Sequence, residues 1–172
     1  MYKKIILATT ILAVTGCVQP QPIVQQPVAS VLQPSVVSKT VLEQMRGFEN
    51  SHDIGVNVYL PSNLKMGSFL NLNVTPNMDG YLKLVVINPN DKIEAVLPNR
   101  YDSGFIRANS TLQTDHKTFG IQTFPPKGMH HILVLFTEKK TPDNYAIMQL
   151  LQNAKSGGYG RSYNKLFALD IH

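Results

Sequence analysis

The feature that most constrains the fold of this chain is a succession of short apolar segments, each followed by turn-forming residues, at a spacing of about ten residues. Residues 54–60 alternate apolar and polar side chains, which is the period of a half-buried strand. Residues 81–87 are almost uniformly apolar and predict a central strand that is buried on both faces. Proline, asparagine, aspartate and glycine fill the turns at residues 75–80 and 88–91. The pattern predicts a mainly β fold, namely an antiparallel β-sandwich.

Two helices are expected beside these strands. Thr40 and Glu43 have the spacing of a capping box, which predicts a short helix over residues 41–48. Thr141-Pro142-Asp143 is typical of a helix start, and the helix that follows is expected to end at Gly157. Its apolar face would contain Ile147, Met148, Leu151 and Ala154. Further strands are expected at residues 69–74, 92–97, 105–108, 118–124, 131–137 and 166–171. The sandwich would therefore carry one appended C-terminal helix.

The first seventeen residues have the order of an export signal. Two lysines precede an apolar run at residues 5–14 that is short for a membrane span. Val14-Thr15-Gly16-Cys17 follows and resembles a bacterial lipobox, and Cys17 is the only cysteine. The resemblance implies that residues 1–16 are a signal peptide, and that Cys17 then carries a diacylglycerol and an N-acyl chain as a membrane anchor. Because Val18 stands where an aspartate favours the inner membrane, the expected location is the outer membrane. The domain would lie in the periplasm, with exposure at the cell surface as the alternative.

Residues 17–38 form a tether that is rich in proline and glutamine and carries no charged residue. Proline removes a backbone donor and fixes φ, so this segment is expected to be extended. It is either a plain spacer or a segment that docks on a partner protein, since several of its residues are apolar. The candidate partner-binding residues are Ile23, Val24, Val31 and Leu32. The remaining residues, 39–172, are expected to form a single domain.

A family resemblance is found within the domain. Residues 79–87 read Asp-Gly-Tyr-Leu-Lys-Leu-Val-Val-Ile, residues 91–99 end in Leu-Pro-Asn, and Pro126-Lys127-Gly128 precedes a later apolar segment. These residues resemble a bacterial domain family of unknown function whose members show a G-Y-L-x-V strand and an L-F-P-N ending. The resemblance covers about residues 54–140. It implies a recognition or assembly unit of the kind that occurs in envelope lipoproteins, and it supplies no catalytic residues.

The side chains that could carry out chemistry are not arranged for it. His130 and His131 are adjacent, so on a strand without a bulge they point to opposite faces and cannot hold one metal ion together. The sequence contains no Gly-x-Ser-x-Gly nucleophile motif. The formal net charge of +5, from 16 basic and 11 acidic residues, includes no basic stripe of the kind that binds nucleic acid. We therefore expect no enzyme activity, no cofactor, no metal site and no nucleic-acid partner.

Two functions are compatible with these features. The first is a non-catalytic scaffold subunit of a cell-envelope complex, related to secretion or to pili, which binds other envelope proteins through edge strands. A second set of candidate partner-binding residues is the loop of Arg100, Tyr101 and Asp102. The alternative is a module that binds glycan or peptidoglycan on exposed aromatic rings. Its candidate residues are Tyr101, Phe105, Tyr159 and Tyr163.

Overall fold

The computed structural model describes residues 40–50, 54–114 and 120–172. The predictions for the signal peptide, the lipobox, Cys17 and the tether fall on residues 1–39 and lie outside the described residues. Val37–His172 forms one compact unit. Among the described residues, two apolar clusters are formed by side chains from Val41 onward and give this unit a core of its own.

The strands of the described residues form three sheets. The largest has the strand order β2-β11-β10-β5-β6, and β7 pairs with the other end of β5. Its strands are β2 (Asn63–Leu64), β11 (Ser162–Ile171), β10 (Gly128–Thr137), β5 (Gly80–Ile87), β6 (Ile93–Leu97) and β7 (Phe105–Ile106). A three-stranded sheet has the order β1 (Val56–Tyr59), β4 (Leu72–Pro76) and β8 (Leu112–Thr114), and β3 (Phe69–Leu70) pairs with β9 (Ile121–Gln122). All pairs are antiparallel except β2 with β11, so the predicted antiparallel architecture is confirmed.

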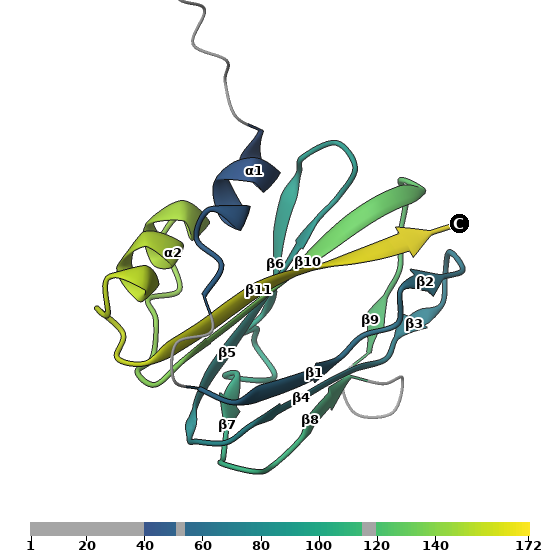
Figure 1. Ribbon diagram of the computed structural model, residues 1–172. Coiled ribbons are helices and arrows are strands. Elements are labelled where there is room, and N and C mark those ends of the chain that lie inside the picture. The colour runs from purple at the N-terminus through teal and green to yellow at the C-terminus, as the bar shows by residue number, and fades with distance from the viewer. Residues whose placement is uncertain (1–39, 51–53, 115–119) are drawn as a thin grey trace, which may run out of the picture. The chain divides into compact units, whose positions relative to one another are not determined.

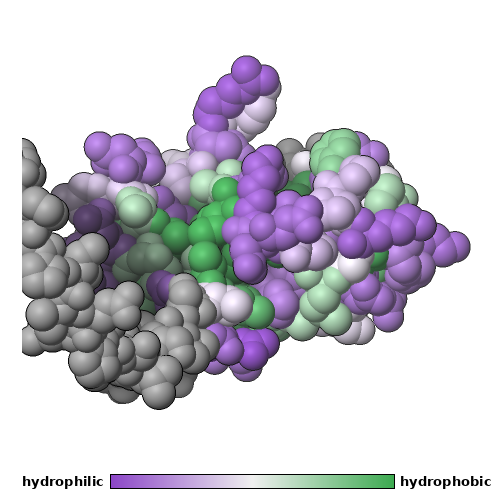
Figure 2. Space-filling view, turned by 90° about the horizontal axis from the view of Figure 1, so that it is seen from above, coloured by the Kyte–Doolittle hydropathy of each residue, from purple (hydrophilic) through white to green (hydrophobic). Residues whose placement is uncertain are grey.

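The large sheet packs on both faces (Figure 1). One face contacts the smaller sheets through a cluster centred on Leu82, Leu84, Val134 and Phe136. The other face is covered by the helices α1 (Val41–Arg46) and α2 (Ile147–Lys155), through a cluster that includes Leu133 and Leu135. Because β5 and β10 contribute to both clusters, their side chains are buried on both faces. Seen from above, this end of the domain has a band of hydrophobic residues with hydrophilic residues on either side (Figure 2).

The strand predictions hold best where the sequence pattern is longest. β5 is the predicted central strand, and Ile54 and Val56 face the core as the alternation requires. The segment expected at residues 69–74 is instead divided into β3 and β4, which belong to different sheets. β4 also continues to Pro76, which was expected in a turn. Val56 pairs with Pro76, so the proline closes the strand and the turn begins one residue later.

The two helix predictions have different outcomes. The capping box of α1 is confirmed, because Glu43 N–H donates to Thr40 Oγ1 at 3.3 Å and Thr40 N–H donates to Glu43 Oε2 at 3.2 Å. The start of α2 at Thr141-Pro142-Asp143 is wrong, since the helix begins at Ile147. Thr141 is buried, and the carbonyl of Pro142 accepts a hydrogen bond from the Lys83 ammonium at 3.3 Å. This tertiary contact takes the place of a helical turn.

Candidate binding site beside edge strand β6

A pocket of about 370 Å³ opens between the large sheet and the β3–β9 pair. Its walls include Val86 of β5, Ile132 of β10 and Leu169 of β11 on one side, and Leu70 of β3 and Ile121 of β9 on the other. These side chains belong to, or pack against, the main apolar cluster, so the pocket is an opening into the edge of the core. Such concave, mainly apolar sites are the usual places where proteins bind ligands or anchor side chains.

The strand β6 borders this pocket and is the last strand on its side of the large sheet. Asn88 N–H donates to Lys92 O, and the register pairs Ile93 with Ile87, Glu94 with Val86 and Ala95 with Val85. In an antiparallel ladder the hydrogen-bonded and non-hydrogen-bonded pairs alternate, so the backbone N–H and C=O groups of Ile93 and Ala95 point away from β5. Within the described part of the chain, no strand pairs with this outer side.

Most polar side chains that line the pocket already have partners within the domain. The Lys92 ammonium contacts the Glu94 carboxylate at 2.6 Å, and both side chains are largely exposed at the rim. Asn88 Oδ1 accepts from the backbone N–H groups of Asn90 and Lys92. Asn99 Nδ2 donates to the carbonyl of Val96. These groups stabilise the turns around β6 and are not free to select a ligand.

His130 differs from these groups. Its side chain lines the pocket, and the residue is 4% exposed. Nδ1 lies 3.0 Å from the carbonyl oxygen of Gly128. A carbonyl oxygen only accepts, so Nδ1 carries the proton and Nε2 of the neutral ring is an acceptor. His131 faces the helices instead, where burial and the charge of Arg46 lower its pKa. The prediction that the two histidines point to opposite faces is therefore confirmed.

The predicted loop of Arg100, Tyr101 and Asp102 joins β6 to β7. Tyr101 is 77% exposed, and the Arg100 guanidinium lies 4.5 Å from the centre of its ring. Asp102 is half-buried, and its carboxylate accepts from the backbone N–H of Gly104 at 2.7 Å. Arg100 and Tyr101 are therefore available at the surface, whereas Asp102 holds the turn.

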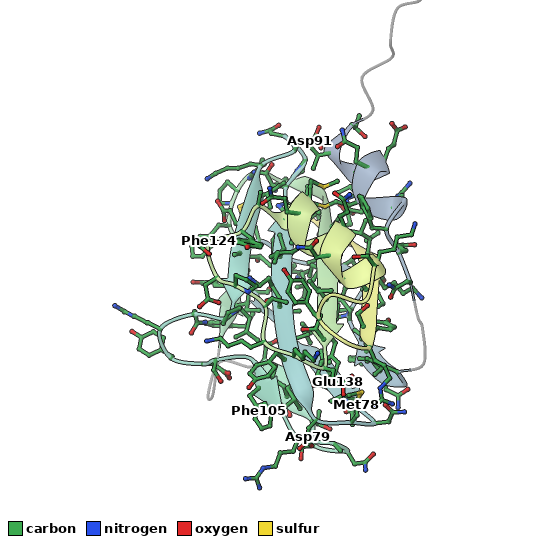
Figure 3. The ribbon with its side chains drawn as sticks, turned by 90° about the vertical axis from the view of Figure 1, so that its left-hand side faces the viewer. Met78, Asp79, Asp91, Phe105, Phe124 and Glu138 are labelled. Carbon is green, nitrogen blue, oxygen red and sulfur yellow. The ribbon has the colours of Figure 1, made fainter. Side chains whose placement is uncertain are left out.

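The four aromatic residues that were considered for glycan binding do not form one surface. Tyr159 and Tyr163 are only 9% and 8% exposed and pack in opposite apolar clusters, so the expectation that they are exposed is wrong. Phe105 lies near Asp79, toward the opposite end of the domain from Asp91 (Figure 3), and its ring contacts Tyr81 at 5.3 Å between centroids. Phe124 is 64% exposed and lies at the pocket, and no sequence pattern singled it out.

Among residues 40–50, 54–114 and 120–172, no group of three histidine, cysteine, aspartate or glutamate side chains is placed to hold a metal ion. Over the same residues, none of the helices has the length and apolar character needed to cross a membrane.

The pocket was missed at the sequence level because its lining comes from segments that are far apart in the chain. Leu70, Glu94, Ile121 and Ile171 line the same space but belong to four different strands. The doublet His130-His131 was the one available signal. It indicates that one imidazole faces the sandwich interior, but it does not show which apolar residues that imidazole meets.

Comparisons with known proteins add the following. No curated protein matches this sequence. A chain from structural studies of the aggregative adherence fimbriae of enteroaggregative Escherichia coli is similar at 10% identity and a TM-score of 0.35. The similarity covers 72% of this chain and 100% of that chain, and at this TM-score it supports no inference about function. Residues 63–140 match a domain of unknown function (DUF4384). The predicted resemblance to a family of unknown function thus corresponds to a DUF4384 domain at residues 63–140.

Proposed function

We propose that this chain is a non-catalytic assembly subunit of a cell-envelope complex and that it binds an extended segment of a partner protein along β6. The observation that carries the proposal is the position of the free edge of β6 directly beside the apolar pocket. A strand added at such an edge gains backbone hydrogen bonds, while a neighbouring pocket receives one of its side chains.

The geometry of β6 suits this mode of binding. The outward groups of Ile93 and Ala95 offer two donors and two acceptors to an added strand. Proteins commonly protect such edges with charged side chains or proline. The charges of β6 are confined here to the Glu94 side chain, which is paired with Lys92. Ala95 is exposed and small, so a neighbouring backbone can approach it closely.

The envelope location is part of the proposal and is supported by the sequence. We propose that Cys17 is lipidated in the outer membrane and that the domain lies in the periplasm, next to components of a secretion or pilus complex. The tether residues Ile23, Val24, Val31 and Leu32 are proposed as a second contact with the same complex. Glycan binding remains the alternative, and Tyr101 is its best-exposed candidate residue.

A pair of variants at one position tests the edge-strand mode. Ala95→Pro removes the outward donor and leaves the pairing with β5 intact, because this N–H points away from β5. Ala95→Val keeps the donor and has a high strand propensity, so it is the matched control. We expect the wild-type protein and Ala95→Val to recover stoichiometric envelope proteins in a mild-detergent pull-down from membranes, and Ala95→Pro to lose them. Retention of the partners by a folded Ala95→Pro variant would contradict the proposed mode.

Recovery of the chain alone, at monomer size, would contradict the assembly function as a whole. Binding of the domain to purified glycan or peptidoglycan would then be measured, and a loss of that binding in Tyr101→Ala would establish the alternative. The combined variant Val31→Ser and Leu32→Ser in the same pull-down separates the contribution of the tether from that of β6.

A further inference from the structure

We infer that the pocket beside β6 receives an aromatic side chain that carries a single hydrogen-bond donor, a tyrosine or a tryptophan, from the bound segment of the partner protein. This inference rests on the proposed function, because it identifies the residue that anchors the partner at the same site.

The first step is the hydrogen-bonding capacity of the pocket. His130 Nδ1 donates to Gly128 O, so Nε2 of the neutral imidazole is left as an acceptor. The residue is 4% exposed and lines the pocket, so the pocket is the space from which a donor can reach this ring. In the described part of the chain, Nε2 is not among the fully enclosed polar atoms that lack a partner, which belong to Asn50, Asn73 and Asn164. A ligand that fills the pocket excludes water from this acceptor, so a ligand that supplies a donor of its own is favoured.

The second step is that the other polar groups at the pocket already have partners and do not favour a charged ligand. The Lys92–Glu94 ion pair is satisfied at the rim, and Asn88 and Asn99 stabilise their own turns. The single hydroxyl proton of Thr123 is shared between the carbonyls of Lys65 and Ser68, which lie 3.0 and 3.1 Å from Oγ1. An ionised ligand group would lose its hydration in the pocket without gaining an opposite charge that is not already paired. A neutral group with one donor fits better.

The third step concerns size and shape. A space of about 370 Å³ is too large to be filled by a small hydroxyl side chain such as serine or threonine. Tyrosine and tryptophan combine a large apolar ring with one polar tip, and they are enriched at interfaces for this reason. The apolar walls, among them Val86, Ile132 and Leu169, suit the ring, and His130 suits the tip.

The fourth step is that an added strand directs side chains to the pocket. Glu94 and Val96 line the pocket. A strand beside β6 lies about 4.8 Å away and alternates its side chains between the same two faces. The residue opposite Glu94 therefore faces the mouth of the pocket. With an aromatic residue at this position, the partner segment can pair with the edge of β6 and place the aromatic ring in the pocket.

The test uses side-chain analogues that differ in one hydroxyl group. p-Cresol is the side chain of tyrosine and toluene that of phenylalanine. Each is titrated into the unit Val37–His172, which contains its own core, and binding is followed by the amide resonances of Ile132 and Ile171 and by the imidazole nitrogens of His130. We expect p-cresol to bind about tenfold more tightly than toluene, because toluene leaves Nε2 unpaired, and to shift the Nε2 resonance. 3-Methylindole, the side chain of tryptophan, should also bind more tightly than toluene.

The variant His130→Asn refines the test. Its amide nitrogen can replace Nδ1 as the donor to Gly128, but it has no group at the position of Nε2. The preference for p-cresol should disappear in His130→Asn and persist in His131→Asn, whose side chain faces the helices. Equal binding of p-cresol and toluene by the wild-type domain, or resonance shifts confined to residues outside the pocket, would overturn the inference. The wild-type Nε2 measurement decides the matter even if His130→Asn does not fold.

The two levels of the proposal fail in different ways. If Ala95→Pro releases the envelope partners but the domain does not distinguish p-cresol from toluene, the edge-strand function stands and the aromatic anchor is wrong. If p-cresol is preferred but Ala95→Pro retains the partners, the pocket binds an aromatic ring that is not presented by a strand paired with β6. Self-association of Val37–His172 that is lost in Ala95→Pro would assign the site to a second copy of this chain and overturn the assignment to a partner protein.

Discussion

Gly104 offers the sharpest quantitative prediction for the fold. It is the last residue of the β6–β7 loop and has a φ of +76°. Its carbonyl accepts a hydrogen bond from Leu82 N–H at 2.7 Å. A Cβ atom at this position would lie 2.2 Å from Leu82 O, which belongs to the backbone of the central strand β5. Gly67 is a natural control because it has φ +82 and nothing lies within 4 Å of its added Cβ. The two residues share the strained backbone conformation and differ in the space around it.

The magnitudes follow from this comparison. The left-handed conformation costs a non-glycine residue about 1–2 kcal/mol, and Gly67→Ala should lose no more than that. Gly104→Ala carries the same cost and must also displace the Leu82 backbone. Disturbing the buried hydrogen bond there adds about 1–3 kcal/mol. The free energy of unfolding of Gly104→Ala should therefore fall about 1–3 kcal/mol further than that of Gly67→Ala.

Urea unfolding of Val37–His172, followed by circular dichroism, measures both values. Unchanged m-values would show that the two variants unfold to similar denatured states. A glycine-to-alanine substitution also changes the denatured ensemble. This effect is common to Gly67→Ala and Gly104→Ala, so it cancels in the difference between their free energies of unfolding. Equal losses in the two variants would refute the reasoning, because the close approach of Leu82 O would then have no energetic consequence.

Two further predictions concern pH. Burial lowers the pKa of Lys83 below its ordinary 10.5, and the charge of Asp143 opposes this shift. Between the pKa of Lys83 in the folded protein and 10.5, the unfolded chain binds more protons than the folded one. The free energy of unfolding should therefore rise as the pH rises toward 10.5. Lys83→Met should abolish this rise in urea midpoint, and a rise that persists would rule out Lys83 as its source. Burial, with Arg46 and His130, lowers the pKa of His131 below 6.5, so stability should fall as the pH drops below that value. His131→Gln should show a smaller fall in the thermal midpoint, and an identical pH profile would contradict the assignment.

The sequence was most informative where a residue's role depends on its close neighbours along the chain. The capping box of α1 needs only Thr40 and Glu43, and both of its hydrogen bonds form as predicted. The uniform apolar run of β5 correctly indicated burial on both faces, because that pattern is a property of one strand. The cap of the β6–β7 turn by Asn99, which accepts from Tyr101 and Asp102 N–H, is equally local.

The failures arise where tertiary contacts decide the outcome. Thr141-Pro142-Asp143 has every local signal of a helix start, but the buried Lys83 ammonium takes the Pro142 carbonyl as its acceptor. Tyr163 was expected to be one of the exposed aromatic rings, whereas it lies within β11 and faces the main core. The pocket is the extreme case, since no pattern within one segment reveals that β3, β6, β9 and β11 meet around His130.

The position of β11 has a consequence for how the protein is made. β11 lies inside the large sheet, between β2 and β10, and pairs with β10 over the whole length of both strands. A growing chain therefore cannot complete this sheet until residues 162–171 have left the ribosome. Until then β10 has an exposed edge that is rich in apolar residues, a form that invites wrong pairing with other chains. The large sheet is thus completed only once β11 is available, and a chain without residues 162–171 keeps the apolar edge of β10 open.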